Sequence, residues 1–341
     1  MSSIPNVSTS RPLVSVVVPT FNRPGYLEEA LRRAVSQTYP HLEILVRDNA
    51  STDEAEKVAA KFSDPRIHYL RHPKNVGMTR NVLGGFLDAR GKYVTNLHDD
   101  DLWEPEFISR MVEAMEAHPE AILSFCDHHI INEKGEIEAA ATDKNTAYFG
   151  RNRLAPGIHQ PFKKLALLDL SIPMAMAVLL RRESIAWDHF PDLVCAYDFW
   201  LVYLACRDGG ACYYLPERLT SYRVHSASES TLGRVRLNMG FIEIYSAMLE
   251  DQRVGEFHPL FRRRMAVHYT ETAIALLRQG DREKARSMTA SSLQLQSSLK
   301  ARLTYLASFV PGLLSRHLPG KLRFPITSFI TSIPSLCISN L

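Results

Sequence analysis

The stretch VSVVVPTFNRPGYLEEALRRAVSQTYPHLEILVRD, residues 14–48, has the clearest secondary-structure pattern of the chain. It begins with a β-branched run, residues 14–18, which Pro19 ends and which is typical of a strand buried on both faces. A helix is predicted over residues 24–37, because apolar residues recur there at helical spacing and proline is favoured in a first turn. Residues 42–48 are expected to form a second strand. These elements predict a βαβ unit.

The same alternation continues to about residue 130 and then gives way to other patterns. Further strands are predicted over residues 66–70, 92–97 and 121–129, and further helices over residues 53–62, 77–89 and 105–117. Alternating strands and helices form a mostly parallel sheet with helices on both faces. We therefore expect an α/β fold with a Rossmann-like mixed, mostly parallel sheet. Beyond residue 231 the pattern is helical, which predicts a helical C-terminal extension.

Polar residues gather where three of the predicted strands end. PTFNR (19–23), RDNASTD (47–53) and HDDD (98–101) follow the first, second and fourth strands. In such sheets ligands bind outside the carboxyl ends of the strands. Neither GxGxxG nor GxxxxGK[ST] occurs, which disfavours a dinucleotide site and a P-loop. Adjacent carboxylates can instead hold a divalent cation against a diphosphate, although acidic residues before a helix also favour the helix dipole.

The composition is that of an ordinary globular protein. The 341 residues suffice for two domains, or for one large domain with an appendage. The five cysteines form no CxxC pair and have no histidine-spaced partner, so neither a zinc site nor a disulfide framework is indicated. The N-terminal segment MSSIPNVSTSRP lacks the apolar core of a signal peptide, and no long uncharged apolar run occurs. We expect a cytoplasmic protein.

The charge is distributed unevenly along the chain. The net charge is +3, yet residues 284–341 contain seven Lys or Arg and no Asp or Glu, which leaves 3 − 7 = −4 for the rest. This tail also contains Leu, Phe, Ile and helix-interrupting Pro, a composition that suits peripheral contact with an anionic inner membrane face. Packing on its own protein, or on a second subunit in a homo-oligomer, is the alternative. No motif that reads RNA or DNA occurs, so no nucleic-acid partner is expected.

Four segments in order carry a resemblance to a known family: residues 14–53, residues 75–105, YDFWL (197–201) and YRVHSAS (222–228). With them the chain resembles the inverting family 2 glycosyltransferases, which have the GT-A fold. The resemblance covers roughly residues 13–228. It implies a metal-dependent hexosyltransferase that moves a sugar from a nucleoside-diphosphate sugar to a hydroxyl of a glycan or lipid-linked acceptor in cell-surface polysaccharide synthesis.

The resemblance also implies which residues bind the donor nucleotide: Pro19, Thr20, Asn22, Arg23, Asp48, Asn75, Arg80 and Asp99. Asp48 matches a carboxylate that accepts a hydrogen bond from uracil, and an ionised Asp can only accept, which favours a UDP- or dTDP-linked sugar. The alternative role of Asp48 is to close a turn with Asn49. Arg80 matches a family arginine near the base or phosphates, and its alternative is a solvated position on a helix.

The acidic cluster matches the part of the family site that holds Mn²⁺ or Mg²⁺. Asp100 aligns with the carboxylate that binds the ion against the diphosphate, and Asp101 and His225 are the further metal residues implied. The commoner family pattern is DxDD. His98 takes the place of its first Asp, which leaves open how the ribose or sugar is held.

Asp198 is the catalytic base that the resemblance implies, because an inverting transfer needs a carboxylate to deprotonate the acceptor hydroxyl. It matches the Asp of the family's ED motif, but Tyr197 replaces the Glu. Capping of the apolar helix that follows is an alternative role. Two other classes stay open: a non-catalytic, membrane-docked protein that binds nucleotide-sugar or glycan, and a sugar nucleotidyltransferase, whose Gly-rich phosphate loop is absent here.

The expected organisation has three parts. Residues 1–130 are predicted to form the nucleotide-sugar-binding half of the GT-A domain, and residues 131–230 the acceptor-binding half with the base. Residues 231–341 are predicted to form the helical, basic region. Between the two halves, the polar segment of residues 132–157 is expected to form a mobile loop over the site.

Overall fold

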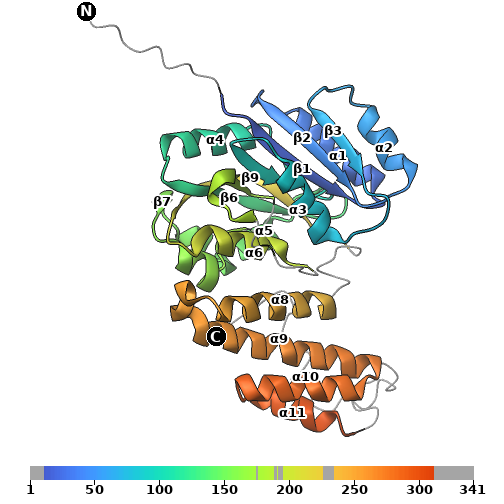
Figure 1. Cartoon of the computed structure of the whole chain (residues 1–341), viewed down its shortest axis with the longest axis vertical. Coiled ribbons are helices and arrows are strands. Elements are labelled where there is room, and N and C mark those ends of the chain that lie inside the picture. Colours follow the sequence, from blue (N-terminus) through green and yellow to red (C-terminus); the bar gives the residue numbers. More distant parts are fainter. Residues whose placement is uncertain (1–10, 174–175, 188–189, 191–194, 226–233, 311–341) are drawn as a thin grey trace, which may run out of the picture. The chain divides into compact units, whose positions relative to one another are not determined.

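The computed structural model describes residues 11–173, 176–187, 190, 195–225 and 234–310. The chain divides into two compact units, Met1–Asp192 with Tyr197–His225, and Leu193–Ala196 with Ser226–Leu341. The first unit contains the sheet and the second is helical (Figure 1). The predicted division of the first unit near residue 130 stays a prediction, and the strand β6 (Ala121–Ile131) runs through that point.

Strands and helices alternate through the first half of the chain. The strands are β1 (Val14–Thr20), β2 (Leu42–Asp48), β3 (Ile67–Arg71), β4 (Tyr93–Asn96) and β6. The helices between them are α1 (Pro24–Val35), α2 (Asp53–Ala60), α3 (Met78–Asp88) and α4 (Phe107–Ala117). β1 pairs in parallel with β2 and β4, and β2 pairs in parallel with β3. The predicted parallel series is confirmed.

Four further strands complete the sheet among the described residues: β5 (Leu102–Trp103), β7 (Gly157–His159), β8 (Val178–Arg181) and β9 (Ala211–Arg223). The strand order is β3-β2-β1-β4-β8-β6-β9-β5, with β7 beside β9. β8 lies antiparallel between β4 and β6, whereas β6 and β9 are parallel. The sheet is therefore mixed, as the expected fold class requires.

Both faces of β1 are covered, which explains its run of valines. Val16 and Val18 belong to the core cluster that includes Leu27 of α1. Val17 points to the opposite face, where α3 approaches so closely that a Cβ on Gly85 would lie 2.4 Å from Val17 Cγ1. A strand with both faces buried in this way holds its carboxyl end rigidly for the site.

The segment of residues 132–157, which the sequence predicted to be a mobile loop over the site, contains helical structure, so the prediction of a loop is wrong and that of mobility stays a prediction. The helix α5 (Ala139–Tyr148) occupies its middle, and a 3₁₀ turn follows at Arg151–Arg153. The buried residues of α5 are Thr142 and Thr146, so the helix lacks the apolar stripe by which helices are recognised in a sequence. Polar contacts, described below, hold it in place.

The second unit consists of helices, which confirms the predicted helical C-terminal region. They are α8 (Arg234–Leu249), α9 (His258–Gln279), α10 (Arg282–Leu295) and α11 (Leu299–Ala307), with a 3₁₀ segment at Gln252–Phe257. α9 packs against both α8 and α10. Within the described residues, no helix combines the length and the apolar character needed to cross a membrane.

Candidate functional site

The ends of β1, β2 and β4 are tied together by hydrogen bonds. Thr20 is the last residue of β1, and its Oγ1 donates to Asp99 Oδ2 at 2.8 Å, just beyond β4. The carbonyl oxygen of Thr20 accepts from the backbone N–H of Asn49, just beyond β2, at 3.0 Å. The structure therefore brings the three polar strand ends to one edge of the sheet, as expected for a ligand site in this class of fold.

The loop after β1 carries Asn22 and Arg23 toward the same edge. Asn22 has a φ of 53°, a left-handed conformation that Asn tolerates better than most residues. Its N–H donates to Ser51 Oγ at 2.8 Å, which fixes the loop against the end of β2. Arg23 then reaches the acidic cluster, with Nη1 2.7 Å from Asp100 Oδ2 and 3.4 Å from Asp99 Oδ1. Pro19 is buried within β1.

Arg223, the last residue of β9, holds the acidic loop of residues 98–101 by hydrogen bonds. The Arg223 backbone N–H donates to Asp101 Oδ1 at 3.0 Å, and its Nε donates to the carbonyl oxygen of Asp100 at 2.8 Å. The guanidinium also donates to Glu29 Oε2 at 2.6 Å and lies 4.9 Å from the ring of Tyr26. Arg223 is therefore turned inward and positions the loop.

The carboxylates of Asp99, Asp100 and Asp101 repel one another, and the cationic side chains nearby offset only part of their negative charge. Burial, followed by the charge of Asp100, raises the pKa of Asp99 to about 7. The same two causes raise the pKa of Asp101 well above its usual range. Burial also acts on Asp100, but His98, His225 and Arg23 outweigh it and hold the pKa of Asp100 below its usual value. A bound cation would relieve this repulsion.

The residues present fit a divalent cation. His98, Asp100 and Asp101 each offer one ligand atom, and these atoms lie within 4.8 Å of one another. Asp101 Oδ2 is buried and has no hydrogen-bond partner among the described residues, which is costly unless a ligand occupies it. His225 Nε2 lies 3.0 Å from Asp100 Oδ2, so His225 contacts the cluster, and its role as a ligand stays a prediction.

Asp48 and Asn75 lie at the same edge but have partners within the protein. Asp48 is buried, and its Oδ1 accepts the N–H of Ser51 at 2.8 Å while its Oδ2 accepts the hydroxyl of Tyr69. The turn-closing role of Asp48 is thus present, and its contact with a base stays a prediction. Asn75 Oδ1 accepts from Asn49 Nδ2 at 3.1 Å, which ties it to the loop after β2. The exposed Arg80 lies on α3.

Asp198 lies in the first turn of the helix α6 (Tyr197–Cys206). Its Oδ1 accepts the N–H of the next residue, Phe199, at 2.9 Å, so Asp198 contacts an N–H group at the start of the helix, but it lies within the helix and is not its N-cap residue. Burial raises the pKa of Asp198, and the charge of His98 only partly opposes this. A carboxylate with a raised pKa suits a general base, and its neighbour Tyr197 reaches the cluster through His98.

The sequence did not reveal the contacts made by Tyr197 and Asn96. Tyr197 Oη lies 2.6 Å from His98 Nε2, and Asn96 Nδ2 donates to the same Oη at 3.0 Å. Asn96 ends β4, whereas Tyr197 begins α6. The only signal in the sequence was that Tyr197 and His98 both depart from the family pattern.

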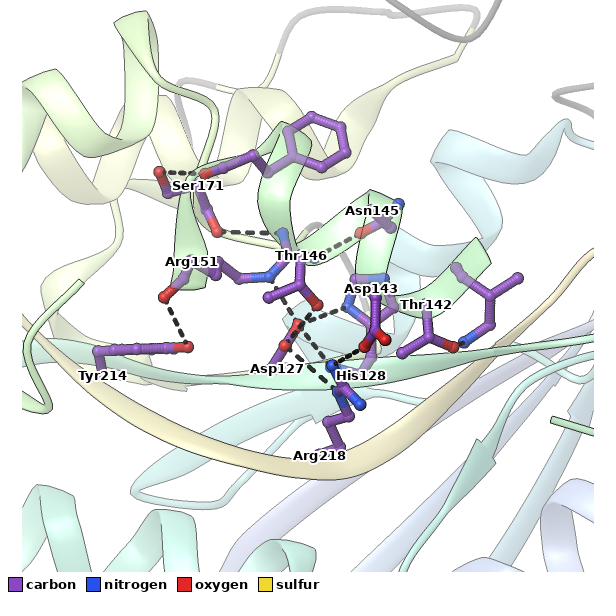
Figure 2. A network of polar contacts seen from close by, with 12 residues as sticks. Asp127, His128, Thr142, Asp143, Asn145, Thr146, Arg151, Ser171, Tyr214 and Arg218 are labelled. Atoms are coloured by element: carbon purple, nitrogen blue, oxygen red, sulfur yellow. Dashed lines mark hydrogen bonds and ion pairs between the residues drawn. The ribbon is translucent and has the colours of Figure 1, made fainter. Parts of the chain in front are cut away.

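A second polar network lies around α5 and does not involve the acidic cluster residues. Figure 2 shows Asp127 of β6 with Thr146, Arg151 and Arg218 pointing toward it. Asp127 accepts from Arg151 Nε and from Thr146 Oγ1, each at 2.7 Å. A concavity of about 670 Å³ adjoins this network and is lined by residues that include Asp127, His129 and Arg218. Because Asp127 is fully engaged, we interpret the network as the attachment of α5 to the sheet.

Comparison with known proteins places the chain in a family. A family model for glycosyl transferase family 2 matches residues 15–185. An uncharacterized glycosyltransferase of Rickettsia conorii is 28% identical over 251 residues, which are 72% of this chain and 38% of that protein. A putative teichuronic acid biosynthesis glycosyltransferase, TuaG of Bacillus subtilis, is 27% identical over 230 residues, which are 65% of this chain and 82% of TuaG. The chain thus spans less than two fifths of the rickettsial relative.

Two solved structures share the fold. S. aureus TarS 1-349 in complex with UDP-GlcNAc has a TM-score of 0.64 and 13% identity, covering 87% of this chain and 89% of that one. The mannosyltransferase PcManGT of Pyrobaculum calidifontis, in complex with GDP-Man and Mn²⁺, has a TM-score of 0.56 and 19% identity, covering 88% of this chain and 81% of that one. The sheet with its flanking helices is the GT-A type that the sequence predicted, and the chain belongs to glycosyl transferase family 2.

Proposed function

We propose that the chain transfers a sugar, with inversion, from a UDP- or dTDP-linked donor to a hydroxyl of a glycan or lipid-linked acceptor. The observation that carries this proposal is the buried Asp101 Oδ2, which has no hydrogen-bond partner among the described residues and lies in the cluster of His98, Asp100 and Asp101 at the strand ends. Such a cluster is suited to hold Mn²⁺ or Mg²⁺ beside a diphosphate. Arg23, which already contacts Asp99 and Asp100, adds a cationic group at the same edge.

The donor site is proposed to form from the ends of β1 and β2 and the loops after β1, β3 and β4. Thr20, Asn22 and Arg23 approach the nucleotide from the end of β1 and the loop after it, together with Pro19. Asp48 approaches it from the end of β2 and Asn75 from the loop after β3, and Arg80 and Asp99 complete the set. The ion would be held by Asp100 and Asp101, with His225 beside Asp100. When bound, it supplies positive charge that stabilises the leaving diphosphate.

Asp198 is the proposed general base. The acceptor oxygen attacks the anomeric carbon, its proton passes to a carboxylate oxygen of Asp198, and the bond from that carbon to the diphosphate oxygen breaks. The burial that raises the pKa of Asp198 supports this role, since a more basic carboxylate takes the proton more readily. Attack opposite the leaving group inverts the anomeric centre.

The relatives support the chemistry and the pathway class. TarS was solved with UDP-GlcNAc and PcManGT with GDP-Man and Mn²⁺, so two proteins of this fold bind nucleotide sugars and one of them also binds Mn²⁺. TuaG is named for teichuronic acid biosynthesis, which supports cell-surface polysaccharide synthesis. For this chain we propose a location at the cytoplasmic face of the membrane, with peripheral contact through residues 284–341. The part of that tail after residue 310 lies outside the described residues.

The experiment that tests the proposal measures release of nucleoside diphosphate from a panel of UDP- and dTDP-sugars with Mn²⁺. One donor should be turned over, and Asp198→Asn should lower the rate about 10²- to 10⁴-fold with UDP affinity retained. The control is Asp143→Asn, which changes an exposed carboxylate of α5. If the protein binds UDP but turns over no donor, the alternative of a non-catalytic nucleotide-sugar-binding protein is supported. If it releases pyrophosphate from a sugar phosphate and a nucleoside triphosphate, the alternative of a sugar nucleotidyltransferase is supported.

A further inference from the structure

The two positions at which this chain departs from the family pattern contact each other. His98 stands where the pattern has an Asp, and Tyr197 stands where it has a Glu. The two residues are 99 positions apart, yet His98 Nε2 and Tyr197 Oη lie 2.6 Å apart. Their rings are nearly perpendicular, with centroids 6.2 Å apart. The two departures from the family pattern are therefore coupled, because each side chain contacts the other.

We infer that Tyr197 is a positioning residue that holds His98 as a nitrogen ligand in the divalent cation site. The inference rests on the proposed function only in that both require a cation at this cluster. It assigns to His98 the place that a carboxylate takes in the commoner pattern. It assigns to Tyr197 no contact with substrate.

The surroundings of Tyr197 fix its hydroxyl. The residue is 2% exposed at the start of α6, and Asn96 Nδ2 donates to its Oη at 3.0 Å. Asn96 is itself buried at the end of β4, where β1 pairs with it. The hydroxyl is thus held between a buried amide and the imidazole of His98, and it has little freedom to move away.

The other nitrogen of His98 points to the acidic cluster. His98 Nδ1 lies 3.7 Å from Asp101 Oδ2, the buried oxygen that has no hydrogen-bond partner among the described residues. That separation is too long for a hydrogen bond and leaves both atoms available as ligands. Histidine ligands usually donate their second ring N–H to a fixed acceptor, which sets the tautomer and the ring orientation. Tyr197 Oη is placed to be that acceptor for Nε2–H.

This donor set has a consequence for metal choice. Mg²⁺ prefers oxygen ligands and near-ideal octahedral geometry, whereas imidazole nitrogen suits the later first-row metals and is accepted by Mn²⁺. Replacement of one carboxylate by His98 also removes a negative charge from a cluster whose carboxylates repel one another. The site is therefore expected to favour Mn²⁺ over Mg²⁺ more strongly than an all-carboxylate site would.

The test measures binding of Mn²⁺ alone to the full chain by electron paramagnetic resonance, with Mg²⁺ as competitor. The variants are Tyr197→Phe, which removes only the hydroxyl, His98→Asp, which supplies the family carboxylate, and the double variant. Tyr197→Phe should weaken Mn²⁺ binding about 10- to 100-fold. His98→Asp should keep metal binding, lower the preference for Mn²⁺ over Mg²⁺, and abolish the ¹⁴N spin-echo modulation that a directly bound imidazole gives. Thermal melting of each variant shows that it is folded.

The double variant separates positioning from a general structural role. In the His98→Asp background, Tyr197→Phe should have no further effect on Mn²⁺ affinity, because the imidazole it positions is gone. The inference would be overturned if Tyr197→Phe lowered Mn²⁺ affinity equally in the wild-type and His98→Asp backgrounds, or if it left Mn²⁺ affinity unchanged. Persistent ¹⁴N modulation in His98→Asp would also overturn it, because the bound nitrogen would then belong to another histidine such as His225. If the wild type binds Mn²⁺ as expected and turns over no donor, the proposed function fails and the inference stands.

Discussion

Arg23 lies against the acidic cluster, which is the proposed place of the donor diphosphate. Its Nη1 lies 2.7 Å from Asp100 Oδ2 and 3.4 Å from Asp99 Oδ1, and because Asp99 is buried and Asp100 is largely shielded from solvent, their charge acts strongly on the guanidinium. In the absence of ligand the guanidinium balances part of the acidic cluster. When a diphosphate binds beside that cluster, the same group is close enough to contribute a charge-assisted hydrogen bond.

Substitution Arg23→Met is therefore expected to weaken UDP binding about 10- to 100-fold, since a hydrogen bond to a charged group contributes about 1.5–3 kcal/mol. Calorimetric titration of UDP in the presence of Mn²⁺ measures the change. Arg32→Met is the matched control, because Arg32 is exposed on α1 and pairs only with Glu28 among the contacts described. Equal affinity for UDP in wild type and Arg23→Met would show that Arg23 does not bind the donor.

At the residue scale, the sequence predicted which polar groups share the site but not how they pair. Asp99, Asp100 and Asp101 are adjacent in the chain, and Thr20 follows a recognisable strand, so their meeting follows from parallel strand order. The contact of His98 with Tyr197 depends on the approach of α6 to the end of β4, which no local pattern encodes. The sequence also did not predict that Arg223 points inward, because its partners Glu29 and Glu133 are distant in sequence.

At the scale of elements, α5 is attached to the sheet by charge and hydroxyl contacts. Burial raises the pKa of Asp127, but the charge of Arg151 and the hydrogen bonds from Thr146 and Arg151 outweigh it and hold the pKa below its usual value. Arg151 is as buried as its partner, with 1% of its side chain exposed. Loss of one member would leave the other buried and uncompensated.

Asp127→Asn is expected to lower the free energy of unfolding by about 3–5 kcal/mol, the usual cost of removing one partner from a buried ion pair. Chemical denaturation monitored by circular dichroism measures it. Asp143→Asn removes an exposed partner of Arg218 in the same network and should cost less than about 1 kcal/mol. A loss in Asp127→Asn no larger than in Asp143→Asn would mean that the network does not hold α5.

His268 of α9 gives the helical unit a dependence on pH. Burial, with a smaller effect from the charge of Arg264, lowers the pKa of His268 to about 4. Between pH 6.5, the approximate pKa of an unperturbed histidine, and pH 4, His268 binds a proton in the unfolded chain but not in the folded chain. The contribution of His268 to the free energy of unfolding is therefore complete above pH 6.5 and is lost as the pH falls toward 4. The full loss is about 3 kcal/mol, from 1.36 kcal/mol per pKa unit.

The unfolding free energy of wild type and His268→Phe at several pH values between 7 and 4 measures this effect. The Phe side chain keeps the stacking that His268 makes with Phe241 and removes the titrating group. The variant should lose less stability than wild type on acidification. Parallel pH curves for the two proteins would contradict the assignment.

The elements that the sequence predicted well are those with strong apolar patterns. β1 and β2 are continuous buried runs, and α1 has an apolar stripe that includes Leu27 and Leu31, so their type and approximate bounds were predicted. β8 and β9 were not predicted, because β8 is four residues long and β9 carries Pro216 and Glu217 in its middle. α5 was missed because its buried residues are threonines, and the buried ion pair beside it is made by Arg151 of the following turn with Asp127 of β6.

At the scale of the whole molecule, the chain combines the sheet unit with a helical unit that ends in a basic tail. Large apolar side chains are exposed at and just beyond α11: Leu299 (67%), Leu306 (62%), Phe309 (49%) and Val310 (49%). Residues 284–341 contain no acidic residue, so apolar and basic groups occur together there. This combination favours binding to an anionic membrane surface.

The protein is therefore expected to sediment with vesicles that contain phosphatidylglycerol and to remain in the supernatant with vesicles of phosphatidylcholine. Leu299→Asn with Leu306→Asn should reduce the bound fraction severalfold, because each exposed leucine would bury apolar area in the lipid interface. Leu168→Asn, at an exposed leucine of the sheet unit, is the control. Concentration-dependent self-association without vesicle binding would instead assign this surface to a homo-oligomer.

The central claim is that the acidic cluster holds a divalent cation against a nucleoside diphosphate. Calorimetric titration of UDP into the full chain with Mn²⁺, with EDTA, and with Mn²⁺ in the Asp100→Asn variant tests it most directly. We expect binding only under the first condition, because the cation would link Asp100 to the diphosphate. Equal binding of UDP under all three conditions would contradict it.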